Sequence, residues 1–254
     1  MRFSANLGFL WADRPLPDAI RAASAAGFDA VECHWPYDVP AAEMAAALAE
    51  TGLPMLGLNT VRGDVAAGDA GLAALPDRRP AARAAIDQAI GYANAIGARN
   101  VHVMAGNASG AAARDCFVDN LRHACRAGAA TGLTILIEPL NRYDAPGYFL
   151  HDNAQVPCII DAVGHDNLRL MFDCYHAQLS GGDVTHQLQR LLPLIGHVQI
   201  AAVPDRGAPD HGELDYRHIY RLLADLGYDA PLGAEYRPSG RTEDSLGWLA
   251  AARA

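Results

Sequence analysis

The sequence predicts an α/β fold, a single (β/α)₈ TIM barrel over residues 1–254. Short apolar runs alternate with alanine-rich helical stretches, and eight such pairs can be counted along the chain. Eight pairs in 254 residues give about 32 residues per pair, the length of one strand–helix repeat in a parallel sheet. No linker, low-complexity tract or charge run marks a second domain. Eight parallel strands favour a closed barrel over an open sheet.

The expected strands are the short apolar runs, and the expected helices follow them. The strands cover residues 3–7, 30–33, 55–59, 101–104, 133–138, 168–173, 198–202 and 232–236. The helices cover residues 17–26, 41–50, 80–96, 114–131, 153–163, 184–192, 216–226 and 243–252. Gly27 and Gly52 mark the ends of the first two helices, because glycine readily adopts the backbone conformation that closes a helix.

The composition excludes several classes of function. The net charge is −9 and no basic run occurs, which disfavours binding to nucleic acid or to an anionic membrane. All 20 basic residues are arginine, so the chain has no lysine amine for Schiff-base or pyridoxal-phosphate chemistry. The five cysteines form no CxxC pair, and we expect a reducing, cytoplasmic setting. The first eight residues are too polar for a signal peptide, and no apolar run approaches the roughly 20 residues of a membrane span.

A carboxylate stands at the end of the fifth expected strand. Pro139 has no backbone N–H to donate to a sheet, so it ends the strand and leaves Glu138 at the carboxyl end. Burying a carboxylate there is costly unless something pairs with it. A structural ion pair with an arginine would explain Glu138 taken alone, but further polar side chains occur on the later apolar strands.

Three more oxygen-bearing side chains lie on the later strands. Asp173 closes the sixth strand, Gln199 lies in the seventh and Glu235 ends the eighth, at successive separations of 35, 26 and 36 residues from Glu138 onward. Each separation is about one strand–helix unit, so we expect the four side chains at the rim where barrel active sites are built. Three carboxylates together require a proton or a cation. An all-oxygen set favours Mg²⁺ or Mn²⁺ over zinc.

These residues lie within motifs that resemble a known family. The motifs are Arg2-Phe3-Ser4-Ala5-Asn6-Leu7, Pro36-Tyr37, Ile137-Glu138-Pro139-Leu140-Asn141, Phe172-Asp173-Cys174-Tyr175-His176, His197-Val198-Gln199-Ile200-Ala201, residues 204–213, and Glu235-Tyr236-Arg237-Pro238. Jointly they resemble the hydroxypyruvate isomerase family, within the xylose-isomerase-like barrels that also include ketose 3-epimerases and apurinic-site endonucleases. The resemblance covers nearly the whole chain.

The resemblance implies a metal-assisted isomerase that interconverts hydroxypyruvate and 2-hydroxy-3-oxopropanoate through an enediolate. In that family the residues matching Glu138, Asp173, Gln199 and Glu235 hold the metal, and the two glutamates act as the catalytic acid/base pair. The oxygen-bearing side chains agree with this chemistry. The isomerisation needs a cation that polarises a carbonyl, and it needs carboxyl groups that move a proton between adjacent carbons.

The resemblance also implies how a small anionic hydroxy-keto acid would be bound. His176 and Arg206 match substrate-contacting positions of the family, whereas a packed loop histidine and a solvated surface arginine are the alternative interpretations. The substrate carboxylate needs a counter-charge, for which the metal, Arg206 and Arg237 are the candidates. The family often carries His or Glu where this chain has Gly207 and Ala208, which leaves the exact substrate open.

Further polar residues lie near the ends of the first five strands. For Asn6, His34, Asn59 and His102 we favour structural hydrogen bonds over a role in lining the pocket. For Asp144 both interpretations stay open.

Three functional interpretations follow from the sequence. The first is the hydroxypyruvate isomerase, with a 2-oxo-tetronate isomerase or a ketose 3-epimerase as its alternative. An endonuclease is disfavoured because that branch binds zinc with several histidines and Gln199 stands in place of one of them. A non-catalytic sugar-acid-binding barrel would be expected to lose a glutamate, and both are present. The choice between Mg²⁺ and Mn²⁺ and the assembly into a homo-oligomer stay open.

Overall fold

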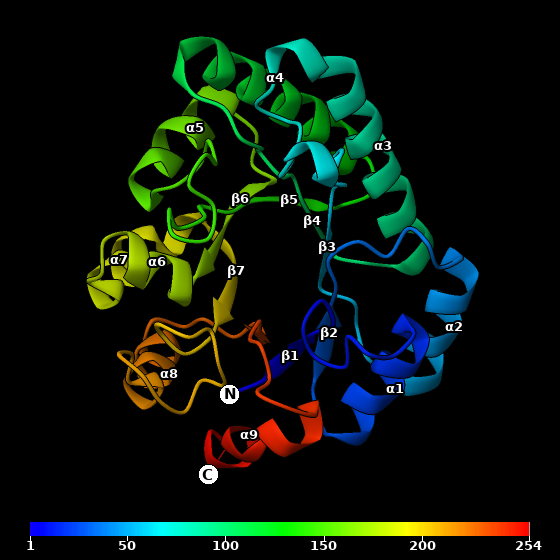
Figure 1. Ribbon diagram of the computed structural model, residues 1–254, viewed down its shortest axis with the longest axis vertical. Helices are drawn as coiled ribbons and strands as arrows, with labels where there is room; N and C mark the ends of the chain where they lie inside the picture. Colours follow the sequence, from blue (N-terminus) through cyan, green and yellow to red (C-terminus); the bar gives the residue numbers. More distant parts are fainter. Residues whose placement is uncertain (254) are drawn as a thin grey trace.

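The strands form one parallel sheet that curls into a barrel, as expected. The computed structural model describes residues 1–253. Its strands are β1 (Phe3–Asn6), β2 (Ala30–Glu32), β3 (Gly57–Asn59), β4 (Asn100–His102), β5 (Thr134–Ile137), β6 (Leu168–Asp173), β7 (Ile195–Ile200) and β8 (Leu232–Ala234). They pair in the order β2-β1-β8-β7-β6-β5-β4-β3. A parallel bridge joins Val31 of β2 to Met55, two residues before β3, so the barrel is nearly closed (Figure 1).

The helices lie around the outside of the strands (Figure 1). They are α1 (Leu16–Ala25), α2 (Ala41–Thr51), α3 (Arg79–Ile96), α4 (Gly110–Ala129), α5 (Val156–Val163), α6 (Cys174–Ser180), α7 (Val184–Leu191), α8 (Tyr216–Asp225) and α9 (Gly247–Ala251). Short 3₁₀ turns are η1 (Val65–Ala67), η2 (Pro76–Arg78), η3 (Asn153–Gln155), η4 (Leu192–Leu194) and η5 (Thr242–Ser245). Within residues 1–253 none of the helices is both long and apolar enough to cross a membrane.

Local polar contacts explain where the structure departs from the expected elements. The sequence pattern does not predict α6, which begins directly after β6 because the Asp173 carboxylate accepts a hydrogen bond from the Tyr175 backbone N–H at 2.8 Å. The pattern predicts one helix over residues 243–252, where the structure has η5 followed by α9. There the Ser245 hydroxyl donates to the Thr242 carbonyl at 2.7 Å and favours a tight turn.

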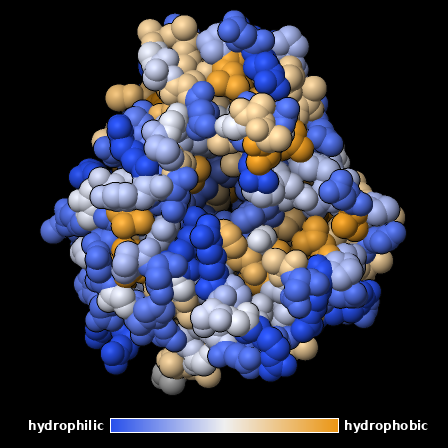
Figure 2. Space-filling view, in the orientation of Figure 1, coloured by the Kyte–Doolittle hydropathy of each residue, from blue (hydrophilic) through white to orange (hydrophobic). Residues whose placement is uncertain are grey.

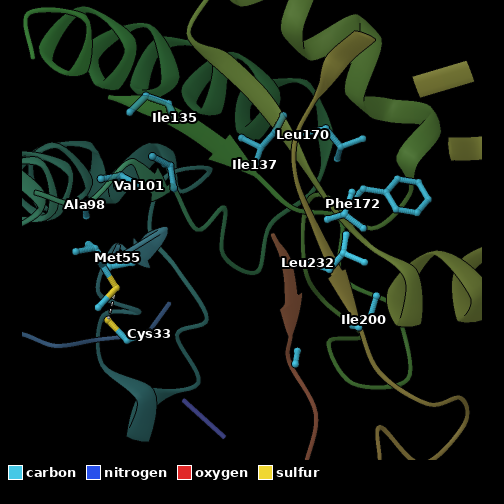
Figure 3. Close-up of a cluster of buried hydrophobic side chains, with 14 of the residues drawn as sticks. Cys33, Met55, Ala98, Val101, Ile135, Ile137, Leu170, Phe172, Ile200 and Leu232 are labelled. Atoms are coloured by element: carbon cyan, nitrogen blue, oxygen red, sulfur yellow. Dashed lines mark hydrogen bonds between the residues drawn. The ribbon is translucent and has the colours of Figure 1, made fainter. Parts of the chain in front are cut away.

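Strand alternation separates an apolar outer layer from a partly polar barrel interior. Ile135, Ile137, Leu170 and Phe172 belong to the hydrophobic core (Figure 3). Alternate positions along a strand face the opposite side. The interior cavity is lined by such positions, among them Asn6, Glu32, Asn59, Asn100, His102, Leu136, Met171, His197 and Gln199. The surface is hollowed near the centre of the face shown in Figure 2. Barrel interiors are usually filled by branched apolar side chains, so the polar lining points to a function.

Candidate metal centre

Four neighbouring strands bring the predicted oxygen donors to one rim of the barrel. Glu138 is the first residue after β5 and Asp173 is the last residue of β6. Gln199 lies within β7, in register with Asp173, and Glu235 is the first residue after β8. All four side chains are buried. The carboxyl ends of parallel strands face the same way, so the four side chains lie at one end of the barrel.

Glu138 and Asp173 form a tight pair of carboxylates, the acidic group, and His176 lies beside them. Each of the three offers one atom suitable for metal binding, and these atoms lie within 4.8 Å of one another. The Nε2 atom of His176 is 3.8 Å from Glu138 Oε1 and 3.6 Å from Asp173 Oδ2. Glu235 reaches the same group through Arg206, whose Nη2 is 2.6 Å from Glu235 Oε2 and 3.4 Å from Asp173 Oδ2.

Two of the predicted donors have a buried oxygen without a partner. Glu138 Oε1 and Gln199 Oε1 are both inaccessible and accept no hydrogen bond. A buried acceptor left unpaired costs about 1–3 kcal/mol, and more when it is charged, so such atoms usually have a partner. Carboxylate and amide oxygens are the ligands that Mg²⁺ and Mn²⁺ prefer. The donor set therefore fits a hard divalent cation.

The carboxylates of the group differ in their electrostatic environment. Burial, reinforced by the charges of Glu235 and Asp173, raises the pKa of Glu138 well above its ordinary value. Burial also raises the pKa of Asp173 to about 7, although Arg206 opposes the change. Burial alone would raise the pKa of Glu235, but Arg206 and His34 outweigh it and lower that pKa to about 2. Without a cation the three carboxylates therefore do not all stay ionised at neutral pH.

Arg206 lies inside the site rather than on the surface. Its side chain packs against two aromatic rings, with the guanidinium carbon 5.1 Å from the centre of Phe9 and 4.9 Å from that of Tyr175. Its backbone has φ 55°, a left-handed conformation that L residues seldom adopt and that costs about 1–2 kcal/mol. The interpretation of Arg206 as a solvated surface residue is wrong. Arg237, in contrast, is exposed, 5.5 Å from the ring of Phe9.

Hydrogen bonds fix the ring of His176 in one neutral tautomer. Its Nδ1 accepts from the backbone N–H of Asn141 at 3.0 Å, and the side-chain amide of Asn141 lies 2.7 Å from the same atom. The Asn141 amide is itself oriented, because its oxygen accepts two backbone N–H groups and its nitrogen donates to Asp144. Burial lowers the pKa of His176 to about 3. The proton therefore sits on Nε2, which makes His176 a hydrogen-bond donor toward the acidic group rather than a metal ligand.

The remaining polar residues near the strand ends have different surroundings. Asn6 Nδ2 and His34 Nε2 lie 3.0 and 2.8 Å from Glu235 Oε1, so both make the expected hydrogen bonds, although Asn6 also lines the interior cavity. For His102 that expectation is wrong, because both ring nitrogens are buried without a hydrogen-bond partner. His102 Nδ1 lies 3.7 Å from Glu138 Oε2, beyond hydrogen-bonding distance.

Two more polar residues lie near the same rim. Asn59 lines the interior cavity, which is the role that the sequence does not favour for it. Asp144 accepts hydrogen bonds from Asn141 at 3.0 Å and from the Tyr175 hydroxyl at 2.9 Å. These bonds support a structural role for Asp144, which also lies 3.9 Å from Arg206.

Sequence reasoning misses two buried residues next to the site, Glu32 and His197. Glu32 ends β2, and its Oε2 lies 2.8 Å from His197 Nε2. Burial opposes the charge of each, yet their attraction lowers the pKa of Glu32 and raises that of His197. A carboxylate in the apolar run Ala30-Val31-Glu32-Cys33 is the same signal that singles out Glu138, and it could have identified Glu32.

Comparisons with known proteins agree with the barrel fold. The family model described as xylose isomerase-like TIM barrel matches residues 20–252. The 2-oxo-tetronate isomerase of Cupriavidus necator is 46% identical to the chain, over 98% of this chain and 97% of that protein. The hydroxypyruvate isomerase of Escherichia coli is 34% identical, over 98% of both chains.

A solved structure of a homologous chain has nearly the same backbone. It is the crystal structure of "AP endonuclease, family 2" from Brucella melitensis, which superposes with a TM-score of 0.95 at 38% identity over 98% of each chain. The expected resemblance to the hydroxypyruvate isomerases is confirmed by relatives that match over nearly their full length. The chain belongs to the xylose isomerase-like TIM barrel family, and within it to the group of the hydroxypyruvate and 2-oxo-tetronate isomerases.

Proposed function

We propose that the chain is a metal-dependent isomerase of short hydroxy-keto acids, which interconverts hydroxypyruvate and 2-hydroxy-3-oxopropanoate. The observation that carries the proposal is the pair of unpartnered buried oxygens, on Glu138 and Gln199, beside Asp173. A bound Mg²⁺ or Mn²⁺ held by these three residues and Glu235 would polarise the substrate carbonyl and stabilise the negative charge that develops on its oxygen.

The two glutamates are suited to move the proton. One carboxylate removes a proton from C3 of hydroxypyruvate, and the electron pair shifts toward the C2 oxygen to give an enediolate. The other carboxylic acid returns a proton to C2, while the proton of the C3 hydroxyl passes to the C2 oxygen, which leaves an aldehyde at C3 and a hydroxyl at C2. Glu138 and Glu235 lie at the ends of β5 and β8, with β6 and β7 between them. They would thus approach a bound substrate from different sides.

His176 and Arg206 are suited to hold the substrate. The Nε2–H of His176 points toward the acidic group and can donate to a substrate oxygen there. Arg206 has a buried cationic group within reach of the same space. A cation bound by Glu235 and Asp173 would compete with Arg206 for these carboxylates. The guanidinium of Arg206 would then be free to form two parallel hydrogen bonds with the substrate carboxylate.

The substrate is best identified with a panel of compounds. Hydroxypyruvate should be isomerised in the presence of Mg²⁺ or Mn²⁺. The four-carbon 2-oxo-tetronate is the second candidate, because the relative from Cupriavidus necator carries that name at 46% identity. Free ketoses and a DNA duplex with an abasic site complete the panel. Cleavage of the duplex without isomerisation of either keto acid would overturn the proposal.

A small substitution next to His34 should weaken the site without replacing an ionisable residue. A Cβ atom on Gly8 would lie 2.1 Å from His34 Nδ1, so Gly8→Ala should push the imidazole away from Glu235. The loss of one hydrogen bond to a charged group is expected to lower kcat/KM about tenfold. Steady-state kinetics against hydroxypyruvate measure the effect. Gly240→Ala is the matched control, since no atom lies within 4 Å of its added Cβ; equal activity of the two variants would contradict the role of His34.

A further inference from the structure

A buried carboxylate behind the candidate metal centre holds one of its donors in place. Glu32 lies inside the barrel with 4% of its surface exposed. Its Oε1 accepts from Gln199 Nε2 at 2.8 Å and from Asn6 Nδ2 at 3.0 Å, and its Oε2 lies 2.8 Å from His197 Nε2. These three groups come from β1 and β7, so Glu32 joins elements on both sides of β8.

The contact with Glu32 determines which atom of Gln199 faces the centre. An ionised carboxylate only accepts hydrogen bonds, so the amide nitrogen of Gln199 must face Glu32. The amide oxygen then points away, and it is the buried Gln199 oxygen that has no partner. With the amide turned over, Gln199 would present an N–H group to the centre, and an N–H group does not ligate a cation.

The chain leaves space for this carboxylate at a specific position. Gly233 lies in β8 and pairs in register with Gln199. A Cβ atom on Gly233 would lie 2.6 and 2.7 Å from the two carboxylate oxygens of Glu32 and 2.8 Å from His197 Nε2. Any larger residue there would displace the pair, so a glycine is required by the position of Glu32.

We propose that Glu32 is a positioning residue of the metal centre, which orients the Gln199 amide so that its oxygen faces the cation. Through Asn6, whose Nδ2 also lies 3.0 Å from Glu235 Oε1, Glu32 steadies a second donor. Groups behind metal ligands typically change the affinity for the metal 10- to 100-fold when they are removed. The inference rests on the proposed function, because it requires that the centre binds a cation.

The test is a calorimetric titration of the purified protein with Mn²⁺ at pH 8. Glu32→Met has a similar shape but no acceptor, and its dissociation constant for Mn²⁺ should rise about 10- to 100-fold. Glu32→Gln is the conservative control, because its amide oxygen can still accept from Gln199. Its dissociation constant for Mn²⁺ should stay within about threefold of the wild-type value. That change is smaller than the effect of losing one hydrogen bond.

A double variant separates orientation from general damage. In Glu32→Met combined with Gln199→Glu, residue 199 carries two equivalent oxygens, so its orientation no longer matters. The affinity for Mn²⁺ should return to within about threefold of the wild-type value. The two substitutions affect the same contact, so their effects do not add and the second offsets the loss caused by Glu32→Met. Damage to the barrel would leave the double variant as weak as Glu32→Met, and that result would overturn the inference.

Two further results complete the test. If Glu32→Met does not fold, as judged by circular dichroism, Gly233→Ala takes its place, because it retains both Glu32 and His197 and displaces the carboxylate. Gly233→Ala should also weaken Mn²⁺ binding about 10-fold or more; unchanged binding in either folded variant would overturn the positioning role while the proposed function stands. Absence of Mn²⁺ binding by the wild type would instead overturn the proposed function.

Discussion

Replacing Glu138 or Glu235 by glutamine should lower kcat for hydroxypyruvate about 10²- to 10⁴-fold. Glutamine has nearly the same shape as glutamate, but its amide takes up no proton at neutral pH and so cannot act as acid or base. An amide oxygen can still ligate a cation. Substrate should therefore still bind in the presence of Mn²⁺ while turnover is lost.

Initial rates at saturating Mn²⁺ and substrate measure kcat, and equilibrium binding of substrate to the inactive variants measures affinity. Glu213→Gln is the matched control, since Glu213 is exposed and accepts only a 3.2 Å hydrogen bond from Gln178. It should keep the activity of the wild type. A kcat within tenfold of the wild type for both Glu138→Gln and Glu235→Gln would contradict their role as the proton-transfer pair.

Removing divalent cations should abolish turnover with little loss of structure. Burial and the neighbouring charges raise the pKa of Glu138, and burial raises that of Asp173 to about 7, so the cation-free site relieves its repulsion by taking up protons. A protonated carboxyl neither holds a cation nor accepts a proton from substrate. The guanidinium of Arg206, close to Glu235 and Asp173, also offsets part of the repulsion in the cation-free site.

The measurement is the rate of isomerisation after dialysis against EDTA, followed by addition of Mg²⁺, Mn²⁺ or Zn²⁺. Activity should disappear on chelation and return with Mg²⁺ or Mn²⁺, while circular dichroism stays the same. The cation should also raise the Tm, because a ligand that binds only the folded state stabilises it. Full activity in EDTA would mean that the reaction proceeds without the cation.

The sequence predicts the fold and the position of the oxygen donors because both follow from local rules. The strand–helix period indicates the barrel, and Pro139 places Glu138 just beyond β5. Strand-end positions place Asp173 and Glu235 at the same rim, whereas Gln199 lies near it because β7 spans Ile195–Ile200 instead of the expected residues 198–202. These inferences need only the direction of each strand and the fact that parallel strands share a rim.

The surroundings of the donors depend on closure of the barrel and are therefore not visible in the sequence. Glu32 and Gln199 are 167 residues apart, and only the folded barrel brings their side chains to 2.8 Å. Arg206 contacts the carboxylates from a loop position with a left-handed backbone, which a polar loop sequence does not reveal in advance. The tautomer of His176, which lies in α6, likewise depends on Asn141 in the segment after β5.

The most direct test of the account is anomalous diffraction from crystals of the protein grown with Mn²⁺. The proposed centre predicts one anomalous peak per chain, with oxygen atoms of Glu138, Asp173, Gln199 and Glu235 at about 2 Å from it. A peak at any other place in the chain, or none at these four residues, would contradict the metal-dependent mechanism.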